Sequence, residues 1–124
     1  MTSDAKSYVL RSGDIVLDVG HRTLVIGPHV FHLTPKECRL LETFLTHQGQ
    51  VLTRQFLMRE VWHTDFVDDT RTLEVHVHWI RRKIEEGRHG RSSGTIHTVR
   101  GVGYLYQPLA TPVRSSAASG SAEP

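Results

Sequence analysis

Nine histidines are the most conspicuous candidates for chemistry in this chain, because imidazole is a common metal ligand and acid–base group. A zinc site needs ligands that converge with tetrahedral geometry. His76 and His78 are two residues apart, so on a helix their side chains would point about 200° apart and could not share one ion. The sequence has no HExxH motif and a single cysteine, Cys38. We therefore expect no structural or catalytic metal and no cofactor.

The usual catalytic signatures are also missing from the sequence, which has no GxSxG, no P-loop and no glycine-rich nucleotide fingerprint. Gly101 and Gly103 are spaced like part of a phosphate-binding loop, but no helix pattern follows them, and a hairpin turn is the better interpretation. Asp65, Asp68 and Asp69 lack the spacing of a calcium loop. They are better explained as charges that complement the dipole of a following helix. We predict that the protein is not an enzyme.

The distribution of charge points to a different activity. The formal net charge of the whole chain is only +2. Residues 81–100, however, contain six Lys or Arg and two Glu, a net charge of +4. A local basic patch attracts polyanions even when the total charge is small. The alternative is that these side chains only solvate the end of a helix.

Length and composition limit the class of protein. The 124 residues are enough for one domain, and a single cysteine excludes a disulfide scaffold and fits a reducing, cytoplasmic environment. The sequence shows no signal-peptide pattern at its start and no apolar run that could span a membrane. Residues 115–124 lack any apolar side chain larger than Ala. We expect disordered segments at 1–7 and 109–124 around one domain at 8–108.

The order of the predicted elements is strands, then helices, then a hairpin. Segments 15–18, 23–26 and 30–33 are rich in β-branched and aromatic residues and are separated by turn formers, which predicts antiparallel strands; 8–10 could add an edge strand. Thr34, Pro35 and Glu37 form a capping-box pattern that starts a helix ending before Gly49. Thr53 predicts a second helix up to Trp62. A third helix is expected from 69 or 70 to 86, stopped by Gly87, followed by strands at 95–99 and 104–107.

A helical wheel separates the third helix into two faces. An apolar stripe should face the core and consists of Leu73, Val77, Ile80 and Ile84. The opposite face carries Arg71, Val75, His78, Trp79 and Arg82. Such a helix fits the major groove of DNA, where these side chains could reach base edges and phosphates.

Three helices followed by a glycine-containing hairpin predict a winged helix. The chain also resembles the C-terminal DNA-binding domain of the OmpR/PhoB family of two-component response regulators, over about residues 13–107. The resemblance depends on motifs in a characteristic order: Leu33-Thr34-Pro35-Lys36-Glu37 with Leu40-Leu41, Val51-Leu52-Thr53-Arg54, Val61-Trp62, Arg71-Thr72-Leu73-Glu74-Val75-His76-Val77, and Thr98-Val99-Arg100-Gly101-Val102-Gly103-Tyr104.

The resemblance implies an α+β winged helix-turn-helix with an N-terminal antiparallel four-stranded sheet, a three-helix core and a C-terminal β-hairpin wing. It implies sequence-specific binding of double-stranded DNA for transcription regulation, with two copies head-to-tail on direct repeats. The third helix would lie in the major groove and the wing in the minor groove. A receiver domain would precede such a domain in a longer regulator. That domain is absent here, so we expect an excised effector domain or a stand-alone relative.

Individual roles also follow from the resemblance. Arg71, Thr72 and His76 match residues that bind phosphates, and Arg81 matches another arginine that contacts the DNA backbone. Glu74 stands where the family has an acid able to accept from a cytosine amine. Thr98 and Arg100 match the wing, and Arg100 is the candidate for minor-groove insertion. The segment before the third helix would face RNA polymerase: His63, Thr64, Asp65, Phe66, Val67, Asp68 and Asp69.

The chain departs from the family pattern at several positions. His78 and Trp79 stand where many members have two arginines, and an indole cannot make the paired guanine contact of an arginine. Trp79 could contact a thymine methyl group, or it could pack against the wing or a second protomer. His63 replaces a common glycine, and Cys38 replaces a common aromatic residue. The competing function is a winged helix that docks proteins and does not bind DNA, which exposed Trp79 and Val75 would also suit.

Overall fold

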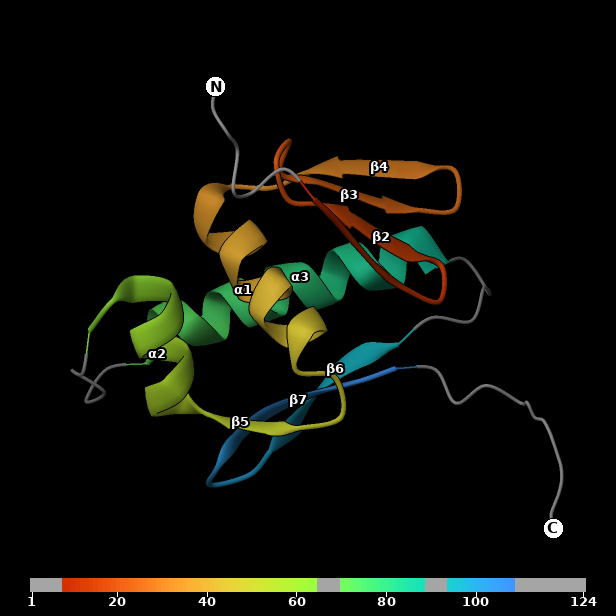
Figure 1. Ribbon diagram of the computed structural model, residues 1–124. Helices are drawn as coiled ribbons and strands as arrows, with labels where there is room; N and C mark the ends of the chain where they lie inside the picture. The colour runs from red at the N-terminus through yellow and green to blue at the C-terminus, as the bar shows by residue number, and fades with distance from the viewer. Residues whose placement is uncertain (1–7, 65–69, 89–93, 109–124) are drawn as a thin grey trace, which may run out of the picture.

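The computed structural model describes residues 8–64, 70–88 and 94–108. Helices lie between two antiparallel sheets, and the long helix α3 crosses the middle of the molecule (Figure 1). The expected α+β winged helix-turn-helix is confirmed. The expected disordered segments at 1–7 and 109–124 lie outside the described residues.

The N-terminal sheet has the order β1 (Val9–Ser12), β2 (Ile15–Asp18), β3 (Thr23–Ile26) and β4 (His29–His32). An edge strand is confirmed, although β1 begins one residue later and ends two residues later than the predicted 8–10, and β4 begins and ends one residue earlier than predicted. The register pairs Ile15 with Ile26 and Leu17 with Leu24. Because side chains alternate along a strand, this register places all four on one face, where they are buried against the helices.

Helix α1 (Pro35–Thr46) begins as the sequence predicts. The Thr34 hydroxyl accepts a hydrogen bond from the Glu37 amide, and the Glu37 carboxylate accepts one from the Thr34 amide. The reciprocal pair satisfies two amide groups that the first turn would otherwise leave without partners. Helix α2 (Arg54–Trp62) has a simpler cap, in which the Thr53 hydroxyl accepts a hydrogen bond from the Phe56 amide at 3.1 Å.

Helix α3 (Arg71–Arg88) ends two residues later than predicted, because it continues through Gly87. The expectation that Gly87 stops the helix was wrong. A Cβ at this position would lie 2.8 Å from the Cβ of Ile26 and 3.2 Å from Cε2 of Phe31. Gly87 is thus a point of close contact between α3 and strands β3 and β4, and tertiary packing explains the glycine.

The C-terminal sheet contains a strand that sequence analysis missed. Strand β5 (Val51–Thr53) pairs with β7 (Gly103–Gln107), which pairs with β6 (Thr95–Val99), so the wing belongs to a three-stranded sheet. Three residues are too few to show strand periodicity. At Gly103, a Cβ would lie 2.0 Å from the carbonyl oxygen of Leu52, so the pairing requires glycine there.

One core joins both sheets. The α3 residues Leu73, Val77, Ile80 and Ile84 are all buried in it, as the helical wheel predicts. The Tyr106 hydroxyl in β7 donates to the Ser12 hydroxyl in β1 at 2.9 Å, which connects the two sheets through a buried hydrogen bond. Burial raises the pKa of Tyr106, so this phenol stays protonated and remains a donor.

Candidate nucleic-acid interface

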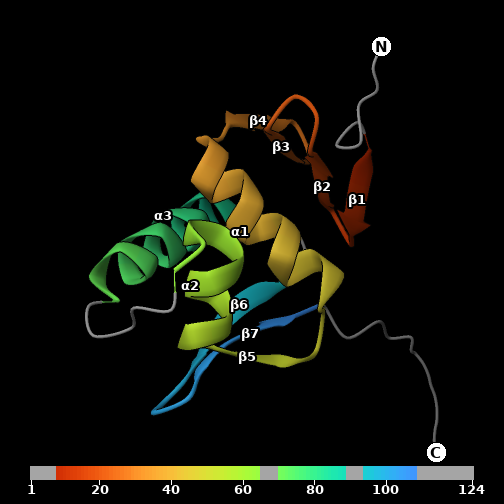
Figure 2. The same cartoon turned by 60° about the vertical axis from the view of Figure 1, so that its left-hand side comes forward.

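The face of α3 opposite the core is solvent-exposed. The residues placed there by the helical wheel are all exposed: Arg71, Val75, His78, Trp79 and Arg82. Thr72 and Glu74 are exposed beside them, and His76 is half-buried. The long axis of α3 lies alongside α2 and above the C-terminal sheet, and the views in Figures 1 and 2 agree on this arrangement. The helix therefore offers a face of mixed cationic, hydroxyl and aromatic groups to a partner.

The first turn of α3 is organised around Thr70. Its carbonyl oxygen accepts from the Glu74 amide at 2.9 Å, and its hydroxyl donates to the Glu74 carboxylate at 3.1 Å. Thr70 lies directly before the first helical residue, Arg71, so α3 begins one or two residues later than the predicted start at 69 or 70. The negative charge of Glu74 in the first turn complements the helix dipole. One of its carboxylate oxygens accepts the hydrogen bond from the Thr70 hydroxyl.

His76 lies between two tryptophans. Its ring is edge-on to Trp62 at 5.1 Å and tilted against Trp79 at 5.3 Å. Its Nδ1 lies 2.8 Å from the Thr72 carbonyl oxygen. A carbonyl oxygen can only accept, so Nδ1 carries the proton and donates, which leaves Nε2 as the atom available to a partner. Trp79 therefore packs against His76 of its own helix, and His76 in turn contacts Trp62 at the end of α2, while 44% of the surface of Trp79 remains exposed.

Arg81 connects α3 to the wing. Its Nε donates to the Ile96 carbonyl oxygen at 2.8 Å, and its Nη2 donates to the Thr98 hydroxyl at 2.6 Å. Its guanidinium carbon lies 5.9 Å from the centre of the Tyr104 ring. The side chain that the family resemblance assigns to the DNA backbone is thus bound to β6 and β7 within this domain. Thr98, also predicted to contact DNA, is its partner.

Arg54 approaches the same tyrosine and was missed in the sequence analysis. Its guanidinium carbon lies 5.7 Å from the Tyr104 ring centre, and its amide donates to the Val102 carbonyl oxygen at 3.4 Å. Burial raises the pKa of Tyr104, and the two nearby arginines oppose that shift. The only available signal was a basic residue directly after the cap Thr53. Two cations on one ring therefore hold α2, α3 and the wing together.

The tip of the wing is a tight turn. The Val102 amide donates to the Val99 carbonyl oxygen at 2.9 Å, and Gly101 at the third position has a φ of 76°. A positive φ at that position favours glycine. Arg100 precedes it and is exposed. The turn therefore projects one arginine from the end of the hairpin.

Two neighbouring α3 cations are already paired. Lys83 lies 3.3 Å from the buried carboxylate of Glu37, which attaches α3 to the start of α1. Arg82 lies 3.8 Å from Glu86 with both side chains exposed. A hollow of about 250 Å³ beside them is lined by Phe31, His78, Trp79, Arg82, Lys83 and Glu86. Of these two cations, only Arg82 has a charge that solvent or a partner can readily reach.

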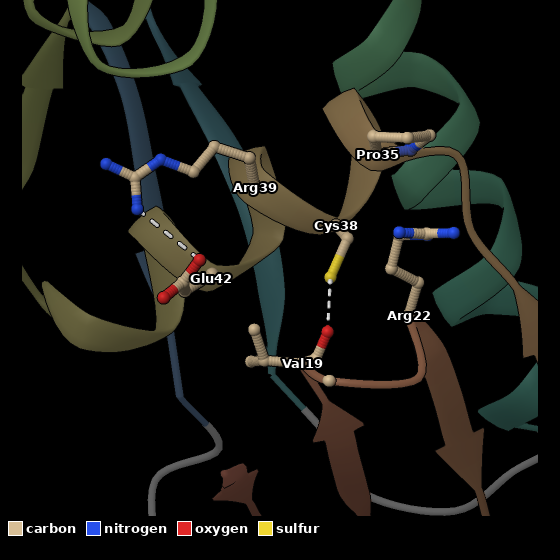
Figure 3. Close-up of a pocket in the computed structure, with 7 residues that line it drawn as sticks. Val19, Arg22, Pro35, Cys38, Arg39 and Glu42 are labelled. Atoms are coloured by element: carbon tan, nitrogen blue, oxygen red, sulfur yellow. Dashed lines mark hydrogen bonds and ion pairs between the residues drawn. The ribbon is translucent and has the colours of Figure 1, made fainter. Parts of the chain in front are cut away.

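A second hollow of about 250 Å³ lies between α1 and the connection from β2 to β3, and Figure 3 shows its lining. Cys38 is 3% exposed, and its Sγ points to the Val19 carbonyl oxygen at 3.9 Å. Arg39 pairs with Glu42 at 3.4 Å in the same wall. Cys38 is thus a small buried side chain in this wall.

The predicted polymerase-facing segment is only partly described. His63 is exposed and has a φ of 56°, in the left-handed conformation that ends α2. This conformation favours glycine, which explains the glycine common at this position in the family; His63 adopts the same conformation. Thr64 is described as well, whereas 65–69 lie outside the described residues.

The described residues contain no cluster of three or more His, Cys, Asp or Glu that could hold a metal ion. Among the helices at 35–46, 54–62 and 71–88, none is both long and apolar enough to cross a membrane.

Comparison with known proteins identifies the architecture. The family model described as "Transcriptional regulatory protein, C terminal" matches residues 29–106, which is more than half of the sequence. The chain belongs to this family. It is a winged-helix DNA-binding domain of the OmpR/PhoB type, and the family is one of transcription regulators, not of enzymes.

Curated relatives of this OmpR/PhoB-type domain are response regulators. The chain is 39% identical over 104 residues to the sensory transduction protein RegX3 of Mycobacterium leprae, covering 82% of this chain and 50% of RegX3. It is 40% identical over 102 residues to the response regulator MprA of Mycobacterium avium, covering 82% of this chain and 43% of MprA. The chain thus spans about half the length of the curated relatives it matches.

Solved structures agree with this assignment. The DNA-binding domain of CpxR from E. coli superposes with a TM-score of 0.71 at 29% identity, covering 84% of this chain and all of that domain (100%). The DNA-binding domain of the response regulator AdeR, solved in complex with an intercistronic region, has a TM-score of 0.65 at 26% identity and covers 79% of this chain and 98% of that one.

Proposed function

We propose that this OmpR/PhoB-type domain binds double-stranded DNA sequence-specifically as the output domain of a response regulator, with α3 in the major groove and the wing in the minor groove. The observation that carries the proposal is the exposed face of α3, which combines arginines, a threonine, histidines and an indole on a helix with a firmly buried opposite face. A convex helix with such a face matches the dimensions of the major groove.

The wing is held in place for a second contact. Arg81 and Arg54 attach it to α3 and α2, and Arg100 projects from its tip. Arginine inserts favourably into the narrow minor groove of A·T-rich DNA, where the negative potential is strongest. Arg100 is therefore assigned to the minor groove, and Arg71, Thr72, His76 and Arg82 to phosphates flanking α3.

The wider assembly follows from the family resemblance and belongs to the proposal. Two copies would bind direct repeats head-to-tail, and the segment at 63–69 would face RNA polymerase. The curated relatives are about twice as long as the part that this chain matches. In a full-length regulator, a receiver domain would account for the remaining length and would regulate DNA binding. The domain would act in the cytoplasm, without a cofactor or enzymatic activity of its own.

The experiment is selection of duplexes from a random pool, followed by a salt titration of binding to the preferred duplex. Each phosphate neutralised on duplex DNA contributes a slope of about −0.9 in log affinity against log salt. Arg71, Arg82 and Arg100 are exposed, so we expect a slope of about −3 for one domain. Failure to retain any duplex at about 50 mM salt would contradict DNA binding and favour a protein-docking winged helix.

A further inference from the structure

The exposed face of α3 has an apolar centre. Val75 is 41% exposed and Trp79 is 44% exposed, and they are the only large hydrophobic side chains exposed on the described residues of this helix. They are four residues apart, so they lie one above the other on the same side of the helix. Arg71 and Arg82 lie one turn beyond either end of the pair. Cations therefore border an apolar strip on the surface that we assign to the major groove.

The indole is held in place within the domain. Its ring contacts His76, which is fixed by its bond to the Thr72 carbonyl oxygen and by the edge-on contact with Trp62. Trp62 itself packs against the core. A side chain ordered before binding loses less entropy when it contacts a partner. Trp79 is thus a rigid apolar surface and not a mobile one.

None of the side chains at positions 75, 78 and 79 can make the bidentate contact by which proteins most often read guanine. The bidentate contact to guanine needs an arginine or lysine. Positions 75, 78 and 79 have a valine, a histidine and a tryptophan, and the nearby Arg81 is engaged with the wing. In the major groove the only apolar group on any base is the C5 methyl of thymine.

We propose that Val75 and Trp79 contact the C5 methyl groups of two thymines, so that methyl contacts set the base preference at the centre of the site. This inference rests on the proposed function. Residues i and i+4 are about 6 Å apart along a helix axis. Base pairs are about 3.4 Å apart along the duplex. The two thymines are therefore expected about two base-pair steps apart or closer, on either strand.

The test uses the preferred duplex from the random pool, with each thymine replaced in turn by deoxyuridine. This change removes the methyl group and leaves every hydrogen-bonding edge intact. At two positions we expect affinity to fall about fourfold each, the factor for losing one methyl-sized apolar contact. Replacing the A·T pair there by 5-methylcytosine·G should bind about fourfold tighter than unmethylated C·G.

Variants assign each methyl to its residue. Trp79→Ala should abolish the effect of deoxyuridine at one position, and Val75→Ala at the other. Val30→Ala is the matched control, because Val30 is an exposed valine on β4 and should leave both effects intact. Thermal unfolding of each variant establishes that the domain remains folded.

Several results would overturn the inference while leaving DNA binding in place. One is a steep salt dependence with less than about twofold change for deoxyuridine at every thymine. Another is a Trp79→Ala variant that binds two adjacent sites less cooperatively but keeps full deoxyuridine sensitivity, which would assign Trp79 to a second copy of the domain. If no duplex is retained at low salt, the proposed function and this inference both fail.

Discussion

Replacing Arg81 by methionine distinguishes a residue that holds the wing from one that binds a phosphate. The substitution keeps most of the aliphatic stem and removes the guanidinium. It eliminates hydrogen bonds to the Ile96 carbonyl oxygen at 2.8 Å and the Thr98 hydroxyl at 2.6 Å, together with the contact to the Tyr104 ring. Without these bonds, β6 loses its direct polar attachment to the centre of α3.

The expected loss of stability depends on how far solvent reaches the Arg81 side chain, which is half-buried. Hydrogen bonds from charged groups contribute about 1.5–3 kcal/mol each when well shielded, and an exposed cation–π contact about 0.5–1 kcal/mol. Solvent and salt reduce these values, so we expect Arg81→Met to lower the free energy of unfolding by about 2 kcal/mol. For a domain of this size the Tm should fall by about 8–16 °C.

Thermal unfolding followed by circular dichroism measures this change, and Arg82→Met is the matched control. Arg82 is the next residue on the same helix, is 65% exposed and has a single long ion pair to Glu86 at 3.8 Å. Its loss should change stability by less than about 0.5 kcal/mol. Its effect should appear instead in DNA binding, as a salt slope shallower by about 0.9.

A double-mutant cycle isolates one of the Arg81 contacts. Combining Arg81→Met with Thr98→Val should show a coupling free energy of about 0.5–1.5 kcal/mol, because both single changes remove the same hydrogen bond. A Tm shift below about 2 °C for Arg81→Met, with no coupling to Thr98, would refute the structural role. If the salt slope then fell by about 0.9, Arg81 would be a phosphate contact as the family resemblance implies.

Four further substitutions test other parts of the molecule. Thr34→Ala removes the cap of α1 and should cost about 1 kcal/mol in chemical denaturation, whereas Thr34→Ser should retain most of it. Gly87→Ala should destabilise by about 1 kcal/mol, because overlap with Ile26 outweighs the better helix propensity of alanine; an equal or higher Tm would contradict this packing. His63→Gly should stabilise by about 1 kcal/mol by relieving the left-handed backbone, and His63→Ala should not. Arg100→Ala should weaken binding most on duplexes with A·T-rich flanks, and an equal loss on all flanks would argue against minor-groove insertion.

The sequence predicted features that depend on neighbouring residues. The Thr34–Glu37 capping box, the Thr53 cap and the buried stripe of α3 all follow local spacing rules, and the structure confirms each. Local rules work there because the relevant hydrogen bonds and periodic faces lie within one element.

The exposed face of α3 was predicted well for the same reason. Which side chains point away from the core is decided by helical periodicity alone, so Val75, Trp79 and Arg82 are exposed as expected. The contacts of Trp79 could not be predicted from periodicity. Trp79 is linked to α2 through His76, which contacts Trp62, and His76 and Trp62 are 14 residues apart in the sequence.

Tertiary structure alone decided the features that depend on distant segments. Strand β5 exists only because β7 pairs with it, and Gly103 is needed where the Leu52 backbone approaches. Gly87 reads locally as a helix stop, yet it is the contact of α3 with the N-terminal sheet. In the sequence, Arg81 is one of several cations in a basic segment. In the fold, its guanidinium donates hydrogen bonds to β6 and so connects the third helix to the wing. The sequence by itself determined the helices, their caps and which face of α3 meets solvent, because those depend on short-range geometry. Only the fold determined which cations remain available to a partner. Arg81 and Lys83 are bound by oxygen atoms from residues distant in the sequence, and only tertiary structure places those oxygens beside them.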